Sequence, residues 1–283
     1  DKTVSRLTAG VGMKLKTNGV AVIEGEAFID GDKEGLFHVR SGASVYTAAY
    51  LMLCTGSDTV IPPIKGLSEN PFWTSKEALE ARTLPEKLTI VGGGVIGMEF
   101  ASFYNSLGVK VTVVELLPEI LGTLDKEIAK MLRSEYTKKG IAFLLKTKVV
   151  EVSATAVTVE RNGKTESLPT DKVLISVGRR PVLEGYGLEA LNLVQENRRL
   201  MVNAFMQTSH PRIYAVGDIT GHSMLAHTAI REGEVAVNHM VGKQDTMRYD
   251  TVPSVVYTNP EVAAVGLTEE EAAAQGLSVR VIK

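Results

Sequence analysis

The chain has 283 residues, 44% of them hydrophobic and 23% charged, with a formal net charge of -2 and one cysteine. This composition is typical of a globular protein of about two domains and gives no reason to expect nucleic acid or a membrane as a partner. A single cysteine excludes an internal disulfide framework and fits an intracellular protein. The chain opens on Asp1 and ends in what reads as the interior of a strand, so we expect a segment of something longer.

The first 71 residues predict a helix, several short strands and a linker. A helix is expected over residues 1–15, because four apolar residues share one stripe: Val4, Leu7, Val11 and Leu15. Turn signals and apolar runs then predict strands at residues 20–23, 37–40, 44–46 and 50–54. Proline and glycine punctuate residues 62–71, which we interpret as a linker into a new domain.

The most informative stretch is residues 88–100, where an apolar strand leads into glycines and then a helix. The glycines have the spacing G-x-G-x-x-G: Gly92, Gly94 and Gly97. In a dinucleotide site the first permits a tight turn, the second lets backbone approach the pyrophosphate, and the third lets helix and strand pack closely. Free N–H groups at the helix start then hold the phosphates. Four apolar residues are expected on the packed face of the helix: Ile96, Phe100, Phe103 and Leu107.

The residues that follow agree with a nucleotide site. Gly108 stands where a left-handed helix cap is expected, and residues 109–114 read as the next strand, with Glu115 at its end. Glu115 lies 21 residues after Gly94, the distance at which an acid reaches the adenosine ribose hydroxyls and repels the 2′-phosphate of NADP. The alternative is a glycine-rich turn with no ligand. Because strand, helix, strand and acid are in register, we predict an NAD site.

The rest of the chain alternates helices and strands. Asp125 is expected to cap a helix that ends at Gly140 and carries Ile128, Met131, Leu132 and Tyr136. We expect strands at residues 141–145, 171–177 and 212–218, a hairpin around Asn162-Gly163, and a break at residues 178–181. Alternation of this kind predicts a parallel sheet covered by helices.

Five segments together resemble the pyridine nucleotide–disulfide oxidoreductases: residues 54–57, 92–99, 178–181, 208–218 and 224–227. The resemblance implies an α/β fold with two Rossmann-like domains, an incomplete one for FAD and one for NAD inserted into it, and the start of an α+β interface domain. The implied boundaries are 1–57 and 178–250 for the FAD-binding domain, 58–177 for the NAD-binding domain, and 251–283 for the start of the dimerisation domain.

The resemblance also implies which residues bind the cofactors. For FAD they are Thr55, Gly56, Ser57, Asp218 at the ribityl chain, and Met224, Leu225, Ala226 and His227 beside the flavin. For NAD they are Gly92, Gly93, Gly94, Val95, Ile96, Gly97, Met98, Glu99, Glu115, Val149 near the adenine, and Gly178. Glu99 is expected close to where nicotinamide and flavin meet. No catalytic residue and no metal site is assigned.

Within the family, Glu115, residues 225–227 and residues 252–262 are most similar to the enzymes that oxidise dihydrolipoamide to lipoamide through FAD and NAD. This similarity implies a homodimer, a small-molecule or lipoyl-domain substrate, a 2-oxo acid dehydrogenase complex as partner, and the cytoplasm or mitochondrial matrix as location. The family's redox cysteine pair and histidine–glutamate pair are absent from these residues. Because a dithiol–disulfide cycle needs two sulfurs, we expect no turnover from this chain alone.

Two other functions stay open: another flavin disulfide reductase, mercuric or glutathione-type, and a truncated, non-catalytic dinucleotide-binding module. Single residues also have simpler interpretations. Cys54, in an apolar strand, is expected to be a buried structural thiol. Asp218 alone reads as a turn residue at the end of a strand, and His227 alone as an ordinary, partly buried histidine. Only the motifs around them suggest a cofactor role. Asn259 stands where the family commonly has histidine, and Ala27 where it often has glycine.

Overall fold

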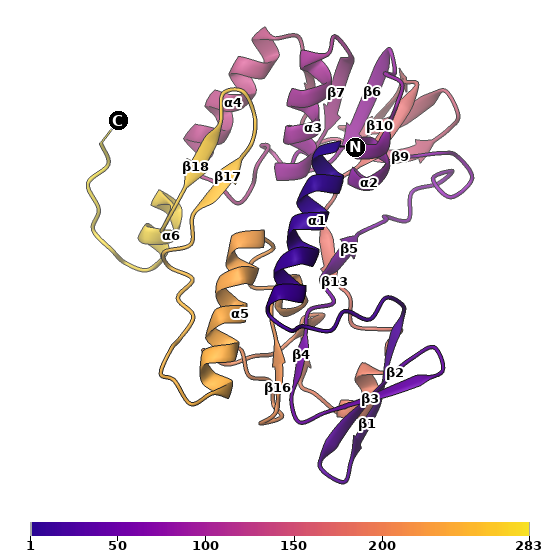
Figure 1. The fold of residues 1–283 in the computed structure, drawn as a ribbon. Coiled ribbons are helices and arrows are strands. Elements are labelled where there is room, and N and C mark those ends of the chain that lie inside the picture. The colour runs from indigo at the N-terminus through magenta and orange to yellow at the C-terminus, as the bar shows by residue number, and fades with distance from the viewer. Residues whose placement is uncertain (1, 283) are drawn as a thin grey trace.

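The fold is mixed α/β, as predicted, and the computed structural model describes residues 2–282 (Figure 1). One half of the molecule, at the top of Figure 1, is a parallel sheet with helices. The other half contains smaller sheets and the helix α5, and two short strands run between the halves. No helix within residues 2–282 combines the length and the apolar character that crossing a membrane requires.

The N-terminal segment consists of a helix and an antiparallel sheet of order β1-β2-β3. The bounds are α1 (Lys2–Thr17), β1 (Ala27–Lys33), β2 (Leu36–Ser41) and β3 (Ser44–Ala48). The helix and the hairpin are as predicted, although α1 buries none of its residues. The predicted strand at residues 20–23 is wrong: its apolar side chains are exposed, and it pairs with no strand of the described chain. A strand needs a neighbour for its backbone hydrogen bonds, and the first residue that finds one is Ala27.

The parallel sheet has the strand order β12-β6-β7-β8. Its elements are α2 (Ser75–Glu80), β6 (Lys87–Val91), α3 (Val95–Ser106), β7 (Lys110–Val114), α4 (Lys126–Lys138), β8 (Ala142–Leu144) and β12 (Lys172–Ile175). Gly108 has the left-handed φ of 84° expected after α3. The Asp125 carboxylate accepts the Glu127 N–H at 2.9 Å and caps α4, as predicted.

The second face of this sheet is covered by an antiparallel sheet of order β11-β10-β9. The bounds are β9 (Lys148–Val152), β10 (Ala156–Arg161) and β11 (Lys164–Pro169). The predicted hairpin turn lies at Asn162-Gly163, where both residues have positive φ. Val157 and Val159 pack against Val91, Val114 and Ile175, so helices and the antiparallel sheet cover opposite faces of the parallel sheet.

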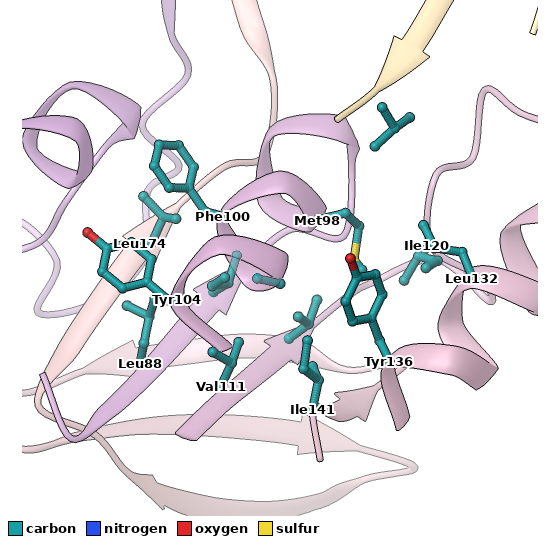
Figure 2. Close-up of a cluster of buried hydrophobic side chains, with 14 of the residues drawn as sticks. Leu88, Met98, Phe100, Tyr104, Val111, Ile120, Leu132, Tyr136, Ile141 and Leu174 are labelled. Carbon is teal, nitrogen blue, oxygen red and sulfur yellow. The ribbon is translucent and has the colours of Figure 1, made fainter. Parts of the chain in front are cut away.

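The helix-covered face forms the largest cluster of buried side chains (Figure 2). In α3 the buried residues are Gly97, Met98, Phe100, Ala101 and Tyr104. The predicted face is therefore partly wrong, since Phe103 and Leu107 are 54% and 46% exposed. Gly97 packs against the Gly92 carbonyl oxygen, and Tyr104, about two turns further along the same face of α3, is buried in place of Phe103.

Helix α4 shows a similar shift. Leu132 and Tyr136 are buried as predicted, whereas Ile128 and Met131 are exposed. Ala129 takes the remaining buried position, because the small side chain lets the helix lie close to the sheet.

The other half of the molecule joins strands from both ends of the chain. Its elements are β4 (Leu51–Leu53), β5 (Ser57–Thr59), β13 (Arg179–Pro181), η1 (Leu188–Leu191), β14 (Gln195–Glu196), β15 (Arg199–Leu200), β16 (Ile213–Ala215), η2 (Asp218–Thr220) and α5 (Ala226–Met240). Strand β16 pairs in parallel with β4, and β13 pairs antiparallel with β5. The break expected at residues 178–181 is thus wrong in part, because Arg179–Pro181 forms one of the two strands that join the halves.

The C-terminal segment returns to the first half. It contains β17 (Ser254–Val256), β18 (Val262–Ala264) and α6 (Glu269–Ala274). The β17–β18 hairpin lies beside α3 and α4 in Figure 1, and Val256 and Val262 join the buried cluster there.

Candidate functional site

The glycine turn after β6 is tightly packed at two positions and open at the third. A Cβ on Gly92 would lie 2.4 Å from the Ser176 carbonyl oxygen, and one on Gly97 would lie 2.1 Å from the Gly92 carbonyl oxygen. Gly92 also has a φ of 108°, which L side chains rarely adopt. A Cβ on Gly94 would meet nothing within 4 Å. The turn therefore presents an open backbone surface at Gly94.

Helix α3 begins at this open surface. Its N-cap Gly94 makes no side-chain capping hydrogen bond, and the first turn contains no acidic residue. The first helical hydrogen bond runs from the Met98 N–H to the Gly94 oxygen. The N–H groups of Val95 and Ile96 point along the start of the helix with the positive end of its dipole, which is an anion-binding arrangement.

Glu115 closes the turn from the end of β7. Its Oε2 accepts the Gly93 N–H at 2.6 Å, and its Oε1 accepts the Leu117 N–H at 2.7 Å. The Leu121 N–H donates to the Gly93 oxygen at 2.9 Å, so the loop after β7 lies against the glycine turn. The half-buried carboxylate thus lies beside the glycines that the sequence predicted it would join.

Three other residues expected near NAD lie outside the glycine turn. Val149 packs in the core with Val91 and Val114. Gly178 lies where the chain leaves the sheet, with its oxygen accepting the Val60 N–H at 3.0 Å. Glu99 lies on α3, and its Oε1 accepts the Tyr257 N–H at 2.9 Å, which connects the helix to the C-terminal hairpin.

A second group of polar side chains lies where β5, β13 and η2 meet. The Ser57 hydroxyl donates to Asp218 Oδ2 at 2.5 Å. The Arg179 guanidinium donates to the Ser57 hydroxyl at 2.7 Å and lies 4.0 Å from Asp218 Oδ2. The Thr55 hydroxyl donates to the Val182 oxygen, which also brings residues 55–57 to the strand that follows Gly178. Ser57 and Asp218, both expected to contact FAD, are therefore in direct contact.

The segment from Met224 to His227 forms the start of α5. Met224 and His227 are exposed, and the N-cap Leu225 makes no side-chain capping bond. The His227 ring is held by a hydrogen bond between Nε2 and the Pro253 oxygen at 2.8 Å. This segment follows Asp218 closely and presents its side chains to solvent.

Sequence reasoning was wrong about one residue of this region and missed another. Cys54 is exposed, not buried, because it lies just beyond the paired residues of β4. Glu232 was missed although it is fully buried on α5. The signal was present: Thr228, Glu232 and Val235 follow the spacing of one helix face, and a charge within such a face is unusual.

Comparisons with known proteins agree with this arrangement. Residues 2–233 match the family model for pyridine nucleotide-disulphide oxidoreductase, and residues 252–283 match its dimerisation domain. The chain is 40% identical over 295 residues to a dihydrolipoyl dehydrogenase of Thermus scotoductus, covering 100% of this chain and 62% of the relative. It is 38% identical over 296 residues to a dihydrolipoyl dehydrogenase of Bacillus subtilis, covering 99% and 62%. The chain thus spans less than two thirds of the length of these relatives.

Two solved structures have the same fold. LpdA from Mycobacterium tuberculosis superposes with a TM-score of 0.88 at 28% identity, covering 99% of this chain and 63% of that one. The HOCl-induced flavoprotein disulfide reductase RclA from Escherichia coli superposes with a TM-score of 0.82 at 28% identity, covering 93% and 61%.

Proposed function

Because the chain belongs to the pyridine nucleotide-disulphide oxidoreductase family, we propose that it is the cofactor-binding part of a dihydrolipoyl dehydrogenase. The reaction is the oxidation of dihydrolipoamide to lipoamide, with electrons passed through FAD to NAD. The proposal rests on the glycine turn, which is unobstructed at Gly94 and hydrogen-bonded at Gly93 to the Glu115 carboxylate. The names of the bacterial relatives support the choice of substrate.

The residues around the glycine turn fit NAD. The N–H groups at the start of α3 donate to the pyrophosphate, which can reach them because Gly94 has no side chain. Each Glu115 oxygen uses one lone pair for a backbone N–H and keeps another for a ribose hydroxyl. The same negative charge repels the additional phosphate of NADP. NAD is therefore the preferred nucleotide.

The residues around Asp218 fit FAD. The Asp218 carboxylate accepts hydrogen bonds from hydroxyls of the ribityl chain. The segment Met224–His227 borders the flavin. Thr55, Gly56 and Ser57, at the start of β5, line the same cofactor. Bound to the protein, FAD and NAD supply the hydride chemistry, and the chain orients them and excludes water. The 283 residues contain one cysteine, so they hold no redox-active cysteine pair.

Partners and location follow the same proposal. The match of residues 252–283 to a dimerisation domain supports a homodimer. The substrate is a free dihydrolipoamide or one carried on a lipoyl domain, as in a 2-oxo acid dehydrogenase complex. The compartment is the cytoplasm or the mitochondrial matrix; a relative in Pisum sativum, 36% identical over 291 residues, is a mitochondrial dihydrolipoyl dehydrogenase. We keep residues 58–177 as the NAD-binding domain, with 1–57 and 178–250 forming the FAD-binding domain.

A spectrum and a titration test the proposal. The 283-residue chain is incubated with FAD, freed of excess cofactor, and examined by visible absorption and by NADH titration. We expect a flavin band, tighter binding of NADH than of NADPH, and no NADH formation from dihydrolipoamide. Asp218→Ala should lose the flavin band and keep NADH binding. A colourless chain that binds no NADH contradicts the proposal, and so does dihydrolipoamide-dependent turnover by this chain.

A further inference from the structure

Beside Asp218 lies a buried carboxylate that no step of the proposed reaction uses. Glu232, on the inner face of α5, is 0% exposed. Its Oε2 accepts the Gly217 N–H at 2.5 Å, and its Oε1 accepts the Tyr249 hydroxyl at 2.6 Å. A buried charge is costly unless both oxygens have partners. These two hydrogen bonds give each oxygen of Glu232 a partner.

Glu232 accepts the N–H of the peptide between Val216 and Gly217, one residue before Asp218. Gly217 has a φ of 79° and a ψ of -155°, and a Cβ on it would lie 3.3 Å from the Ala229 side chain. Its carbonyl oxygen accepts both the backbone N–H and the hydroxyl of Thr220, each at 3.0 Å. Gly217 is therefore held on its N–H side by Glu232 and on its carbonyl side by Thr220. The direction of the next side chain, Asp218, depends on both contacts.

Tyr249 extends this arrangement to the segment after α5. Its hydroxyl is part-buried, and its ring stacks on His222 with centroids 5.0 Å apart. Burial and the neighbouring Glu232 raise the pKa of Tyr249, so the hydroxyl keeps its proton and remains a donor. Burial raises the pKa of Glu232, and the hydrogen bonds from Tyr249 and Gly217 oppose that rise.

We propose that Glu232 is a positioning residue for FAD, with Tyr249 as its support. Glu232 holds the Gly217 N–H and thereby directs the Asp218 carboxylate toward Ser57, at the start of β5. The inference rests on the proposed FAD site, but it concerns residues that do not touch the cofactor. Replacing a glutamate that only stabilised the packing of α5 would lower the unfolding free energy without moving the Asp218 carboxylate.

Three variants of the 283-residue chain test the role. In Glu232→Ala the Gly217 N–H loses its acceptor, and we expect FAD to bind at least about tenfold more weakly while NADH binding changes by less than about twofold. Glu232→Gln keeps an oxygen for Gly217 and an N–H for the Tyr249 oxygen, so it should restore most of the FAD affinity. Glu234→Ala is the matched control, because Glu234 is exposed on the same helix and should leave both affinities unchanged.

Two readouts separate this inference from the proposed function. FAD affinity is measured by quenching of flavin fluorescence, and the Asp218 carboxyl carbon is followed by NMR in each variant. Unchanged FAD affinity in Glu232→Ala, or an equal loss of FAD and NADH binding, overturns the positioning role. If the wild-type chain binds no FAD, the proposed function fails by itself, and the Asp218 signal decides the inference. A signal that shifts in Glu232→Ala and returns in Glu232→Gln supports positioning, and an unmoved signal overturns it.

Discussion

The Glu115 carboxylate accepts a hydrogen bond from the Gly93 N–H at 2.6 Å, so the acid that ends β7 also holds the centre of the glycine turn that ends β6. A Cβ on Gly93 would lie 3.2 Å from the same carboxylate oxygen. One side chain thus shapes the glycine turn and, in the proposed function, also binds the ribose. The hydrogen bond to Gly93 needs only an oxygen, whereas discrimination against NADPH needs the negative charge, so substitutions can distinguish the two tasks.

Replacing Glu115 should weaken NADH binding and reduce its preference over NADPH. Glu115→Ala removes the acceptor of the Gly93 N–H and the negative charge, and losing hydrogen bonds to a charged group corresponds to about 1.5–3 kcal/mol, or roughly 10- to 100-fold in affinity. Glu115→Gln keeps an oxygen for Gly93 but lacks the charge, so it should keep more NADH affinity and still accept NADPH better. Fluorescence titration with both nucleotides measures this. An unchanged NADH-to-NADPH ratio in both variants would exclude the assigned role.

Substitutions at two glycines of the turn should separate an effect on NADH binding from an effect on the free energy of unfolding. Gly97→Ala places a Cβ 2.1 Å from the Gly92 oxygen, and such overpacking costs about 1–3 kcal/mol of unfolding free energy. Gly94→Ala meets nothing within 4 Å, so the fold should stay within about 0.5 kcal/mol of wild type while the methyl group blocks the pyrophosphate. Urea unfolding and NADH titration on both variants test the pair. A stable Gly97→Ala, or a Gly94→Ala that binds NADH normally, would contradict the assigned geometry.

Tyr136 should secure the C-terminal hairpin. Its hydroxyl accepts the Asn259 N–H at 2.8 Å and donates to the Ser102 hydroxyl at 2.7 Å. Tyr136→Phe removes two part-buried hydrogen bonds, each contributing about 0.5–1.5 kcal/mol, and should expose residues 254–264 to proteolysis. Tyr104→Phe is the control, because its hydroxyl bonds to the Ala78 oxygen and does not touch the hairpin. Equal protection of the hairpin in all three proteins would refute the prediction.

The stability of the chain should depend on pH through Glu232. Burial raises its pKa in the folded chain above the value of 4.5 in the unfolded chain, although the hydrogen bonds from Tyr249 and Gly217 act against it. The folded state then binds more protons, so this contribution is complete below the unfolded pKa and is lost as pH rises through the folded pKa. Nearby Asp218 acts in the same direction as burial.

Glu232→Gln removes that titration. The unfolding free energy of Glu232→Gln, relative to wild type, should therefore rise as pH increases above 4.5. Urea unfolding at several pH values gives the two curves, and Glu234→Gln, at an exposed position, controls for surface charge. Parallel curves for wild type and Glu232→Gln would show that Glu232 has no raised pKa.

Local signals were enough to predict much of the fold and of the nucleotide turn. Glycines that need positive φ, the Asp125 cap and the turn at residues 162–163 act within a few residues, so the sequence contains their cause. Glu115 was also predicted at the end of its strand, because strand and helix lengths fix its distance from the glycines.

Features that depend on distant partners were predicted less well. Phe103 and Tyr104 are adjacent aromatic residues, and only tertiary packing decides which one is buried. Residues 20–23 have the composition of a strand but lack a neighbouring strand in the described chain. The hydrogen bond to Glu99 comes from Tyr257, in a hairpin 158 residues further along the chain, which no local pattern predicts.

The strands β5 and β13 have a mechanical consequence. Because Arg179–Pro181 pairs with Ser57–Thr59 and the Val60 N–H donates to the Gly178 oxygen, the chain enters and leaves the nucleotide unit at one place. The C-terminal hairpin returns to this unit as a second attachment, because the Tyr257 N–H donates to Glu99 and Val256 and Val262 pack in the core. Two separate attachments restrict the movement of one half of the molecule relative to the other more than one attachment would.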